Sequence, residues 1–273
     1  SPSLATSKVT VPTALPPAYA HIPLILGPDR KRLSKRHGAA SVEDLEADGI
    51  LPQPCRNALA LLGWSYDDRT TTFTRDELIE KFSITRISRS PAVFDMKKLE
   101  VMNGRYIRSL PPEEFAEELV AYLEKIGYLA ERGPEAVEIA RRSAPLVQRK
   151  LSKLSEYDAL AGWLYRPLEI EPEAWETLVA DVKHSIQAIG GGLGRLEAVE
   201  PYTQEAIKDA LQDQLHIMGE NAREFLEPIR IAVTGRRVST GLYESLAFIG
   251  REKAVGRLRA TLARLGEIWG AAA

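Results

Sequence analysis

The stretch of the chain with the most distinctive chemistry is a basic segment that ends in Lys35-Arg36-His37-Gly38. Five of the seven residues from Arg30 to Arg36 are Lys or Arg. Such a segment cannot be buried without partners, because removing an unpaired charge from water is costly. It must therefore face water or a polyanion such as a chain of phosphates. Taken alone, it also fits a solvated basic turn or a nuclear-localisation-like run.

Basic residues are concentrated again between Lys81 and Arg108, where seven Lys/Arg stand against Asp95 and Glu100. Residues 1–110 contain 16 Lys/Arg and 12 Asp/Glu, a net charge of +4, whereas the remainder contains 20 and 26, a net charge of −6. This asymmetry excludes a general polyanion binder. Any binding of nucleic acid would use local patches on an otherwise acidic body.

Composition places the chain among ordinary globular proteins. It has 273 residues, of which 44% are hydrophobic and 27% charged, enough to bury a substantial core. No apolar run approaches the length of a membrane span, and we find no hydrophobic signal segment. The single cysteine, Cys55, excludes an internal disulfide framework and a multi-cysteine zinc site, and we expect no metal site. A cytoplasmic protein without membrane contact is the simplest expectation.

The elements that position the basic residues are predicted to be mainly helices. Residues 21–26 indicate a short strand before the basic segment. Ser41 with Asp44, and Thr74 with Glu77, have the spacing of capping boxes and predict helices that begin just after Ser41 and Thr74.

Proline and tryptophan mark further features of the first part of the chain. Pro52 and Pro54 are predicted to open a helix over residues 57–62 that ends at Gly63. Ser90-Pro91 predicts an N-cap with Pro at the first helical position, followed by a helix over 93–103. Trp64 is predicted to be a core or hinge aromatic.

The second part of the chain is predicted to be entirely helical, apart from one ambiguous segment. Apolar spacing and turn residues predict helices from Pro111 onwards, over 135–151, 175–189 and 207–218, and over 242–265 in two parts. Gly190-Gly191-Gly192 is predicted to end the third of these. Residues 228–235 alternate apolar and β-branched residues as a strand would, but no partner strand is evident nearby.

The basic segment carries a resemblance to a known family. Arg32-Leu-Ser-Lys-Arg36 resembles the signature loop of class I aminoacyl-tRNA synthetases, Lys-Met-Ser-Lys-Ser, and with residues 21–29 it resembles bacterial glutamyl-tRNA synthetases in particular. The resemblance runs from about Pro17 to Leu265. Further segments agree in the family's order: Ala58–Trp64, Ser90–Asp95 with Lys98-Leu99, Asn103–Arg108, Pro145–Gln148, Pro228–Gly235 and Gly250–Ala254.

The resemblance implies a domain organisation. It covers only the C-terminal part of such an enzyme, and the catalytic Rossmann domain with its His-x-Gly-His signature is expected to precede residue 17 and to be missing. Residues 228–235 are expected to be helical, as in the family. Val101-Met102, where the family usually has Trp, is expected to alter local packing only. The implied parts are a tail or linker over 1–16, the signature loop with a stem-contact domain over 17–110, and two all-helical anticodon-binding subdomains over 111–168 and 169–273.

The resemblance also implies an activity, in which glutamate attacks the α-phosphate of ATP and the acyl group then passes to tRNA. Lys35 stands at the second lysine of the signature motif, which contacts the pyrophosphate end of ATP, and Arg32 stands at the first. Ser34 and the backbone around Leu33 would help to close the loop. Cations and backbone N–H groups that meet the developing negative charge supply such catalysis. ATP with Mg²⁺ is the implied cofactor of the whole enzyme, and this chain alone is expected to bind none and to be inactive.

Contacts to tRNA are implied for two groups of residues. Backbone contacts position an RNA, and anticodon bases are read by stacking and by hydrogen bonds from Arg and polar side chains. For each residue the alternative is an ordinary solvated helix face. The backbone candidates are Arg86, Arg89, Lys97, Lys98, Arg105 and Arg108, and the anticodon candidates are first Arg149 and Lys150 and then Arg236 and Arg237.

Two functions are compatible with these residues. The first is the tRNA-binding part of a glutamate–tRNA ligase, expected to be monomeric, with the glutamate-accepting tRNA as its partner. The second is a free-standing, non-catalytic RNA-binding or scaffolding protein derived from such a synthetase. An upstream His-x-Gly-His domain in frame would favour the first, and a native start at Ser1 would favour the second. Whether glutamine tRNA is also charged stays open.

Overall fold

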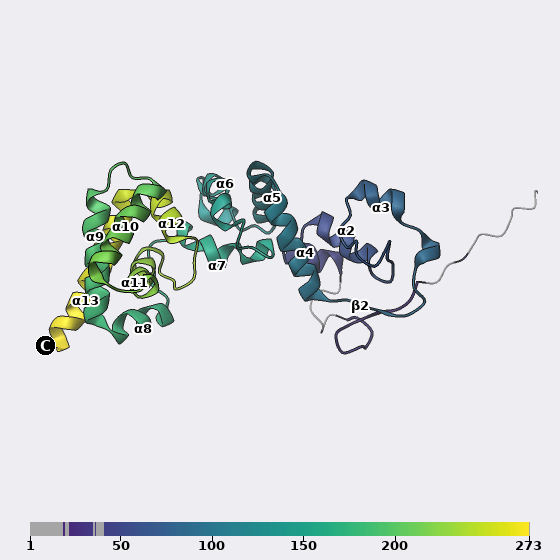
Figure 1. The fold of residues 1–273 in the computed structure, drawn as a ribbon, viewed down its shortest axis with the longest axis horizontal. Helices are drawn as coiled ribbons and strands as arrows, with labels where there is room; N and C mark the ends of the chain where they lie inside the picture. Colours follow the sequence, from purple (N-terminus) through teal and green to yellow (C-terminus); the bar gives the residue numbers. More distant parts are fainter. Residues whose placement is uncertain (1–18, 20–21, 35, 37–40, 273) are drawn as a thin grey trace, which may run out of the picture. The chain divides into compact units, whose positions relative to one another are not determined.

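The computed structural model describes residues 19, 22–34, 36 and 41–272. The described residues form thirteen α-helices, several short 3-10 helices and one two-stranded sheet (Figure 1). This confirms the predicted class, a mainly helical chain with very few strands. None of the described helices is both long enough and apolar enough to cross a membrane.

The chain divides into two compact units, which we describe separately. The smaller unit contains Ser1–His37 and Arg56–Asp95, and the larger contains Gly38–Cys55 and Met96–Ala273. The predicted domain boundaries at residues 16, 110 and 168 follow from the family resemblance and stay predictions.

The sheet of the smaller unit joins two distant segments. β1 (Ile25–Leu26) pairs in parallel with β2 (Ala92–Val93), so the strand predicted over 21–26 is present but shorter. The helix predicted over 93–103 is present but begins later, as α4 (Met96–Ser109), so the predicted start at Val93 and the Ser90 N-cap are wrong. The amides of Ala92 and Phe94 donate to the carbonyl oxygens of Leu24 and Leu26, at 3.2 and 2.8 Å. These pairings with a remote segment satisfy the backbone in an extended form and override the local Ser-Pro signal.

The core of the smaller unit is built around Trp64. Its ring lies 5.5 Å from the ring of Phe73 and 5.4 Å from that of Phe82, and only 3% of the residue is exposed. This confirms Trp64 as a core aromatic. The neighbouring elements are α2 (Pro52–Ala60), α3 (Arg75–Lys81) and the 3-10 helix η2 (Ile84–Arg86).

Both predicted capping boxes are present. Thr74 and Glu77 cap α3 reciprocally, and Ser41 and Asp44 do the same for α1 (Val42–Ala47). In each box the side-chain oxygen of the cap accepts from the third helical amide, and the acid accepts from the amide of the cap. These bonds occupy donors that a helix start otherwise leaves unpaired, which is why so short a motif fixes where the helix begins.

The larger unit contains two hydrophobic cores. The first is built mainly from α5 (Pro112–Lys125), α6 (Ala136–Val147) and α7 (Tyr157–Ala161), with α4 (Met96–Ser109) and the short 3-10 helices η3 (Ala130–Arg132), η4 (Leu154–Glu156) and η5 (Gly162–Tyr165) around them. The helix predicted to begin near Pro111 is α5. Its apolar side chains are buried at Phe115, Leu119, Tyr122 and Leu123, whereas Ile126, just beyond its end, is 46% exposed.

The second core lies among six helices, which gather into one bundle in Figure 1. They are α8 (Pro172–Ala180), α9 (Val182–Ala198), α10 (Gln204–Met218), α11 (Ala222–Thr234), α12 (Leu242–Ile249) and α13 (Arg251–Ala272). The ambiguous residues 228–235 belong mostly to α11, which confirms the helix implied by the family resemblance. Their apolar side chains are fully buried, so packing decides against the strand propensity.

The prediction for residues 175–189 is wrong in two respects. The segment is two helices rather than one, because Asp181 caps α9 with its side chain on the amide of His184. The three glycines do not end α9, which continues to Ala198. A Cβ at Gly192 would lie 2.6 Å from Cδ1 of Ile229, so this glycine lets α9 and α11 pack closely.

Candidate nucleic-acid interface

The basic segment begins as a tight turn that folds back on β1. The amide of Gly27 donates to the Lys31 carbonyl oxygen at 2.8 Å, and the amide of Leu33 donates to that of Ile25 at 3.0 Å. Arg30 has a positive φ of 59°, which closes the turn. The backbone of the turn is thus paired internally, and its charged side chains are left to the outside.

The described side chains of this segment differ in exposure. Lys31, Arg32 and Arg36 are exposed, whereas Leu33 and Ser34 are partly buried. The predicted catalytic residue, Lys35, lies outside the described residues. Exposed guanidinium and ammonium groups beside partly buried Leu33 and Ser34 suit contact with an anionic phosphate chain.

The predicted backbone contacts fall in both units. In the smaller unit, Arg86 donates to the Tyr66 carbonyl oxygen at 2.9 Å and lies 5.6 Å from the centre of the Tyr66 ring. Arg89 is exposed and has no hydrogen bond or ion pair to any described residue. Arg86 therefore has a structural partner, and Arg89 is available to solvent.

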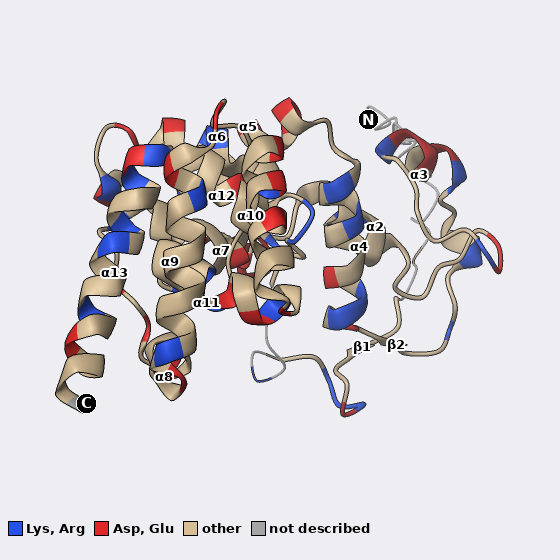
Figure 2. Cartoon of the chain, turned by 60° about the vertical axis from the view of Figure 1, so that its left-hand side comes forward, with Lys and Arg blue, Asp and Glu red and all other residues tan. Residues whose placement is uncertain are grey.

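The other four backbone candidates are exposed on α4, in the larger unit. Lys98 and Arg105 are seven residues apart and so share one face of the helix. Neither Lys97 nor Arg105 has a hydrogen bond or ion pair among the described residues, and Arg108 makes a long bond, 3.5 Å, to the Leu151 carbonyl oxygen. Figure 2 shows the positive charge on α4 at both of its ends. An exposed row of cations on a helix fits electrostatic contact with a phosphate backbone.

The anticodon candidate Lys150 lies at a junction that the sequence did not reveal. Its Nζ donates to the Ser239 carbonyl oxygen at 2.7 Å. From α11, Nη1 of Arg230 donates to the Thr240 carbonyl oxygen at 2.8 Å and contacts Oγ of Ser239 at 3.4 Å. Two cations from distant segments therefore converge on one turn, with the exposed Arg149 beside Lys150.

The environment of this junction lowers the pKa of both cations. Burial lowers the pKa of Lys150, and the neighbouring positive charge of Arg230 adds to the effect. Burial also lowers the pKa of Arg230, although Glu244 and Glu227 oppose it. Sequence reasoning missed Arg230, and the only signal for it was a lone cation inside an apolar helix.

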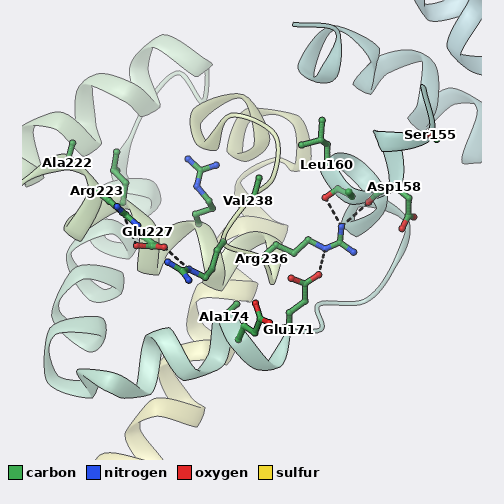
Figure 3. Close-up of a pocket in the computed structure, with 15 residues that line it drawn as sticks. Ser155, Asp158, Leu160, Glu171, Ala174, Ala222, Arg223, Glu227, Arg236 and Val238 are labelled. Carbon is green, nitrogen blue, oxygen red and sulfur yellow. Dashed lines mark hydrogen bonds and ion pairs between the residues drawn. The ribbon is translucent and has the colours of Figure 1, made fainter. Parts of the chain in front are cut away.

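Arg236 and Arg237 line a cleft of about 1220 Å³ within the larger unit (Figure 3). Nη1 of Arg236 donates to the carbonyl oxygens of Asp158 and Ala159, both at 2.8 Å, and its Nε pairs with Glu171 at 3.0 Å. Its side chain is only 16% exposed. Arg236 therefore clamps the start of the second core to the first and has little capacity left for a ligand.

The remaining charges of the cleft are also balanced. Nε of Arg237 lies 3.0 Å from Oε1 of Glu227. The other carboxylate oxygen of Glu227, Oε2, lies 3.6 Å from Nε of Arg223. Four arginines and four acids line the cleft: Arg223, Arg230, Arg236 and Arg237 with Asp158, Glu171, Glu173 and Glu227. Such a surface has no net attraction for a polyanion. Among the described residues, no group of three or more His, Cys, Asp and Glu could hold a metal ion.

Comparison with known proteins gives two family matches. The family described as the anticodon binding domain matches residues 114–262. The catalytic domain of class I tRNA synthetases for glutamate and glutamine matches residues 9–101, which include the basic segment.

The similar curated proteins are glutamate–tRNA ligases. One from Dehalococcoides mccartyi is 36% identical over 260 residues, which are 93% of this chain and 52% of the relative. One from Saccharopolyspora erythraea is 38% identical over 255 residues, 92% of this chain and 50% of the relative. The chain thus spans about half the length of the relatives it matches.

A solved structure has the same fold. A glutamate tRNA ligase from Elizabethkingia meningosepticum, crystallised with its amino acid, superposes with a TM-score of 0.74 at 20% sequence identity. The match covers 92% of this chain and 52% of that one. At this identity the likeness concerns the fold alone.

Proposed function

Because the chain belongs to the anticodon binding domain family, we propose that it is the tRNA-binding part of a glutamate–tRNA ligase. The observation that carries the proposal is the match of that family to residues 114–262 in a chain whose relatives, over 93% of its length, are glutamate–tRNA ligases. In the whole enzyme the glutamate-accepting tRNA is the partner. We expect the protein to act as a monomer in the cytoplasm.

The exposed cations on α4 are proposed to contact the tRNA backbone. Lys97 and Arg105 have no partners among the described residues, so they can meet phosphates without first breaking an ion pair. Phosphate contacts of this kind position an RNA and release counterions, and they carry little sequence information. Arg86 is a weaker candidate because it is already bound to Tyr66.

Reading of the anticodon is proposed to centre on Arg149 and Lys150. Lys150 is held against the turn at Ser239 together with Arg230, so the cationic group is fixed in place before any RNA arrives. A fixed donor loses less conformational freedom on binding than a mobile one. Arg236 is engaged in the clamp at Glu171 and is a poorer candidate than the sequence suggests.

The basic segment is proposed to bind the phosphates of ATP in the whole enzyme. Arg32, Leu33, Ser34 and Lys35 would face the phosphates of ATP, with which Mg²⁺ would be bound. The chemistry of glutamate activation also needs an amino-acid pocket and the rest of an ATP pocket. We propose that the present chain lacks these and is inactive alone.

Inactivity can be measured directly. The purified chain is expected to give no ATP–pyrophosphate exchange above background in the presence of glutamate, because a cationic loop without the opposite wall of the site cannot orient the reactants. A full-length relative serves as the positive control. Robust exchange by the chain would show that the activating site is complete within these residues.

The tRNA proposal is tested by salt-dependent binding of the full chain to tRNA. Lys97→Ala with Arg105→Ala is expected to weaken binding to any tRNA and to reduce the slope of log K against log salt concentration by about 1 to 2.

Arg149→Ala with Lys150→Ala is expected to reduce discrimination between matched and altered anticodons, by about tenfold for a lost charged contact. Arg223→Ala is the control, since this arginine is already paired with Glu227. Unchanged binding in both double variants would refute both assignments.

The alternative is a free-standing, non-catalytic RNA-binding or scaffolding protein derived from such a synthetase. Such a protein would have the same tRNA-binding surfaces as the ligase but no catalytic domain. The gene sequence upstream of Ser1 separates the two, since an in-frame His-x-Gly-His domain supports the ligase. Binding of tRNA without anticodon preference would instead favour the alternative.

A further inference from the structure

A second cavity, of about 740 Å³, lies within the larger unit against α13. We call it the α13 pocket. It shares no lining residue with the predicted tRNA contacts. Four cations line it, Arg132, Arg166, Lys253 and Arg257, against a single lining carboxylate, Glu135. This local excess stands out because residues 111–273 carry six more acids than bases.

Arg257 is held in the wall of the pocket without a carboxylate partner. Its Nη1 donates to the Val233 carbonyl oxygen at 2.7 Å and its Nη2 to that of Arg166 at 3.4 Å. Its guanidinium lies 5.3 Å from the centre of the Trp163 ring, and burial lowers its pKa. A cation that is desolvated and bonded only to neutral groups keeps an unbalanced charge, which an anion would compensate.

Arg132 and Arg166 both face Asp158. Nη2 of Arg166 lies 3.2 Å from Oδ1 of Asp158, and Nη2 of Arg132 lies 3.7 Å from the same oxygen. Arg132 also lies over the Tyr128 ring, 3.4 Å from its centre, and its buried Nε has no hydrogen-bond partner among the described residues. Nη1 of Arg132 also lies 3.9 Å from Oε2 of the exposed Glu131. The surplus positive charge of the pocket therefore rests mainly on Arg257 and Lys253.

Lys253 completes the pocket from an exposed face of α13. It has no hydrogen bond or ion pair to any described residue, and it lies one helical turn before Arg257. Gly256 and Ala260 lie on the same side and are exposed, and a Cβ built at Gly256 would meet nothing within 4 Å. Figure 2 shows positive charge on successive turns of α13. Small residues between the cations keep the pocket open.

From these observations we propose that the α13 pocket binds phosphate groups. Three guanidinium groups fixed by backbone, ring and carboxylate contacts, together with the exposed ammonium of Lys253, match the several oxygens of a phosphate. The volume exceeds that of a single phosphate and suits a pyrophosphate or a nucleotide. The phosphate can belong to a free anion or to the backbone of an RNA. Binding of a free anion goes beyond the proposed function, and binding of an RNA backbone would add a contact to it.

The test uses the full chain and two variants of α13. Pyrophosphate is titrated at low salt, with the amide resonance of Gly256 as the local reporter and that of Gly219 as the reference. Lys253→Ala is expected to weaken binding roughly fivefold, as for loss of one charged contact. Arg259→Ala is the matched control, because Arg259 lies on the same helix, is exposed and is paired with Glu197 at 2.7 Å. It is expected to leave binding unchanged.

A parallel titration with tRNA identifies the source of the phosphate. If Lys253→Ala also weakens tRNA binding and lowers its salt slope by about 1, the pocket takes an RNA phosphate. If it affects pyrophosphate alone, the pocket takes a free anion, whether or not the chain binds tRNA. If neither ligand responds to Lys253, or if Arg259→Ala has an equal effect, the proposal is wrong.

Discussion

Replacing Gly235 with alanine is expected to lower the free energy of unfolding of the larger unit by about 3 kcal/mol or more. Gly235 ends α11 with a φ of 75°, a conformation that costs an alanine about 1 kcal/mol. The larger part of the effect is steric. A Cβ at this position would lie 2.0 Å from the Glu169 carbonyl oxygen, so backbone must move to accommodate it.

The backbone around Gly235 has little freedom to move. The Gly235 carbonyl oxygen accepts from the amide of Glu171 at 2.9 Å, and the next residue, Arg236, pairs with the side chain of Glu171. Further along, the amide of Thr240 donates to the Leu160 carbonyl oxygen at 3.3 Å. The segment from 235 to 240 is therefore the seam between the two cores of the larger unit, and a displacement at Gly235 would loosen it.

Gly219→Ala is the matched control for this substitution. Gly219 also caps a helix, α10, with a positive φ of 67°, but a Cβ there would meet nothing within 4 Å. We expect a loss of only about 1 kcal/mol, the backbone cost alone. Urea unfolding measures both. Equal losses in the two variants would mean that the contact with Glu169 relaxes freely and that the seam is not rigid.

Local signals in the sequence predicted local structure well. The capping boxes at Ser41 and Thr74 placed two helix starts correctly, because each box satisfies the helix's own unpaired amides and needs no other segment. Apolar periodicity placed most of the helices of the second part for a similar reason: burial of one face is a property of the helix itself.

Two of the failures involve contacts with distant segments. Ser90-Pro91 is a sound helix start, but the following residues pair with β1 across more than sixty positions of sequence. The glycines at 190–192 look like a helix end, but Gly192 makes room for Ile229. A residue type limits the backbone conformations that a position can adopt. Which of these conformations the chain adopts depends on the tertiary contacts of that position.

The same limit applies to the candidate site. The sequence could identify exposed cations on α4, since a helix face follows from spacing. It could not distinguish Arg149, which is exposed, from Arg236, which is a partly buried clamp, because both are in basic pairs. Nor could it show that Lys150 and Arg230, eighty positions apart, bind one turn.

Asn103→Ala is expected to lower the free energy of unfolding of the larger unit by about 3 kcal/mol. The Asn103 side chain is completely buried and bonds three backbone groups, two in the segment 49–51 and one at Ser152. Its Oδ1 accepts from the amide of Leu51 at 2.9 Å, and its Nδ2 donates to the carbonyl oxygens of Ser152 and Gly49 at 2.7 and 3.4 Å. Removal leaves up to three buried backbone groups unpaired, each at roughly 1 to 3 kcal/mol, with partial relief where water enters.

Val101→Ala on the same helix is the control for this loss. Val101 is 50% exposed, and its truncation is expected to change stability by less than about 0.5 kcal/mol. Urea unfolding again measures both variants. A loss of under 1 kcal/mol for Asn103→Ala would show that α4 and the two segments it bonds hold together without this side chain.

Asn103 also bears on function, because it anchors the helix that presents Lys97 and Arg105. A loosened α4 still carries the same cations, so Asn103→Ala is expected to weaken tRNA binding while leaving the salt slope unchanged. Lys97→Ala with Arg105→Ala should also weaken tRNA binding, but with a reduced salt slope and little change in stability, since both side chains are exposed and unpartnered among the described residues. A reduced slope in Asn103→Ala would mean that α4 positions its cations only through this one buried amide. In that case the arrangement of the cations on α4 would depend on the buried contacts of Asn103 and not on the helix alone.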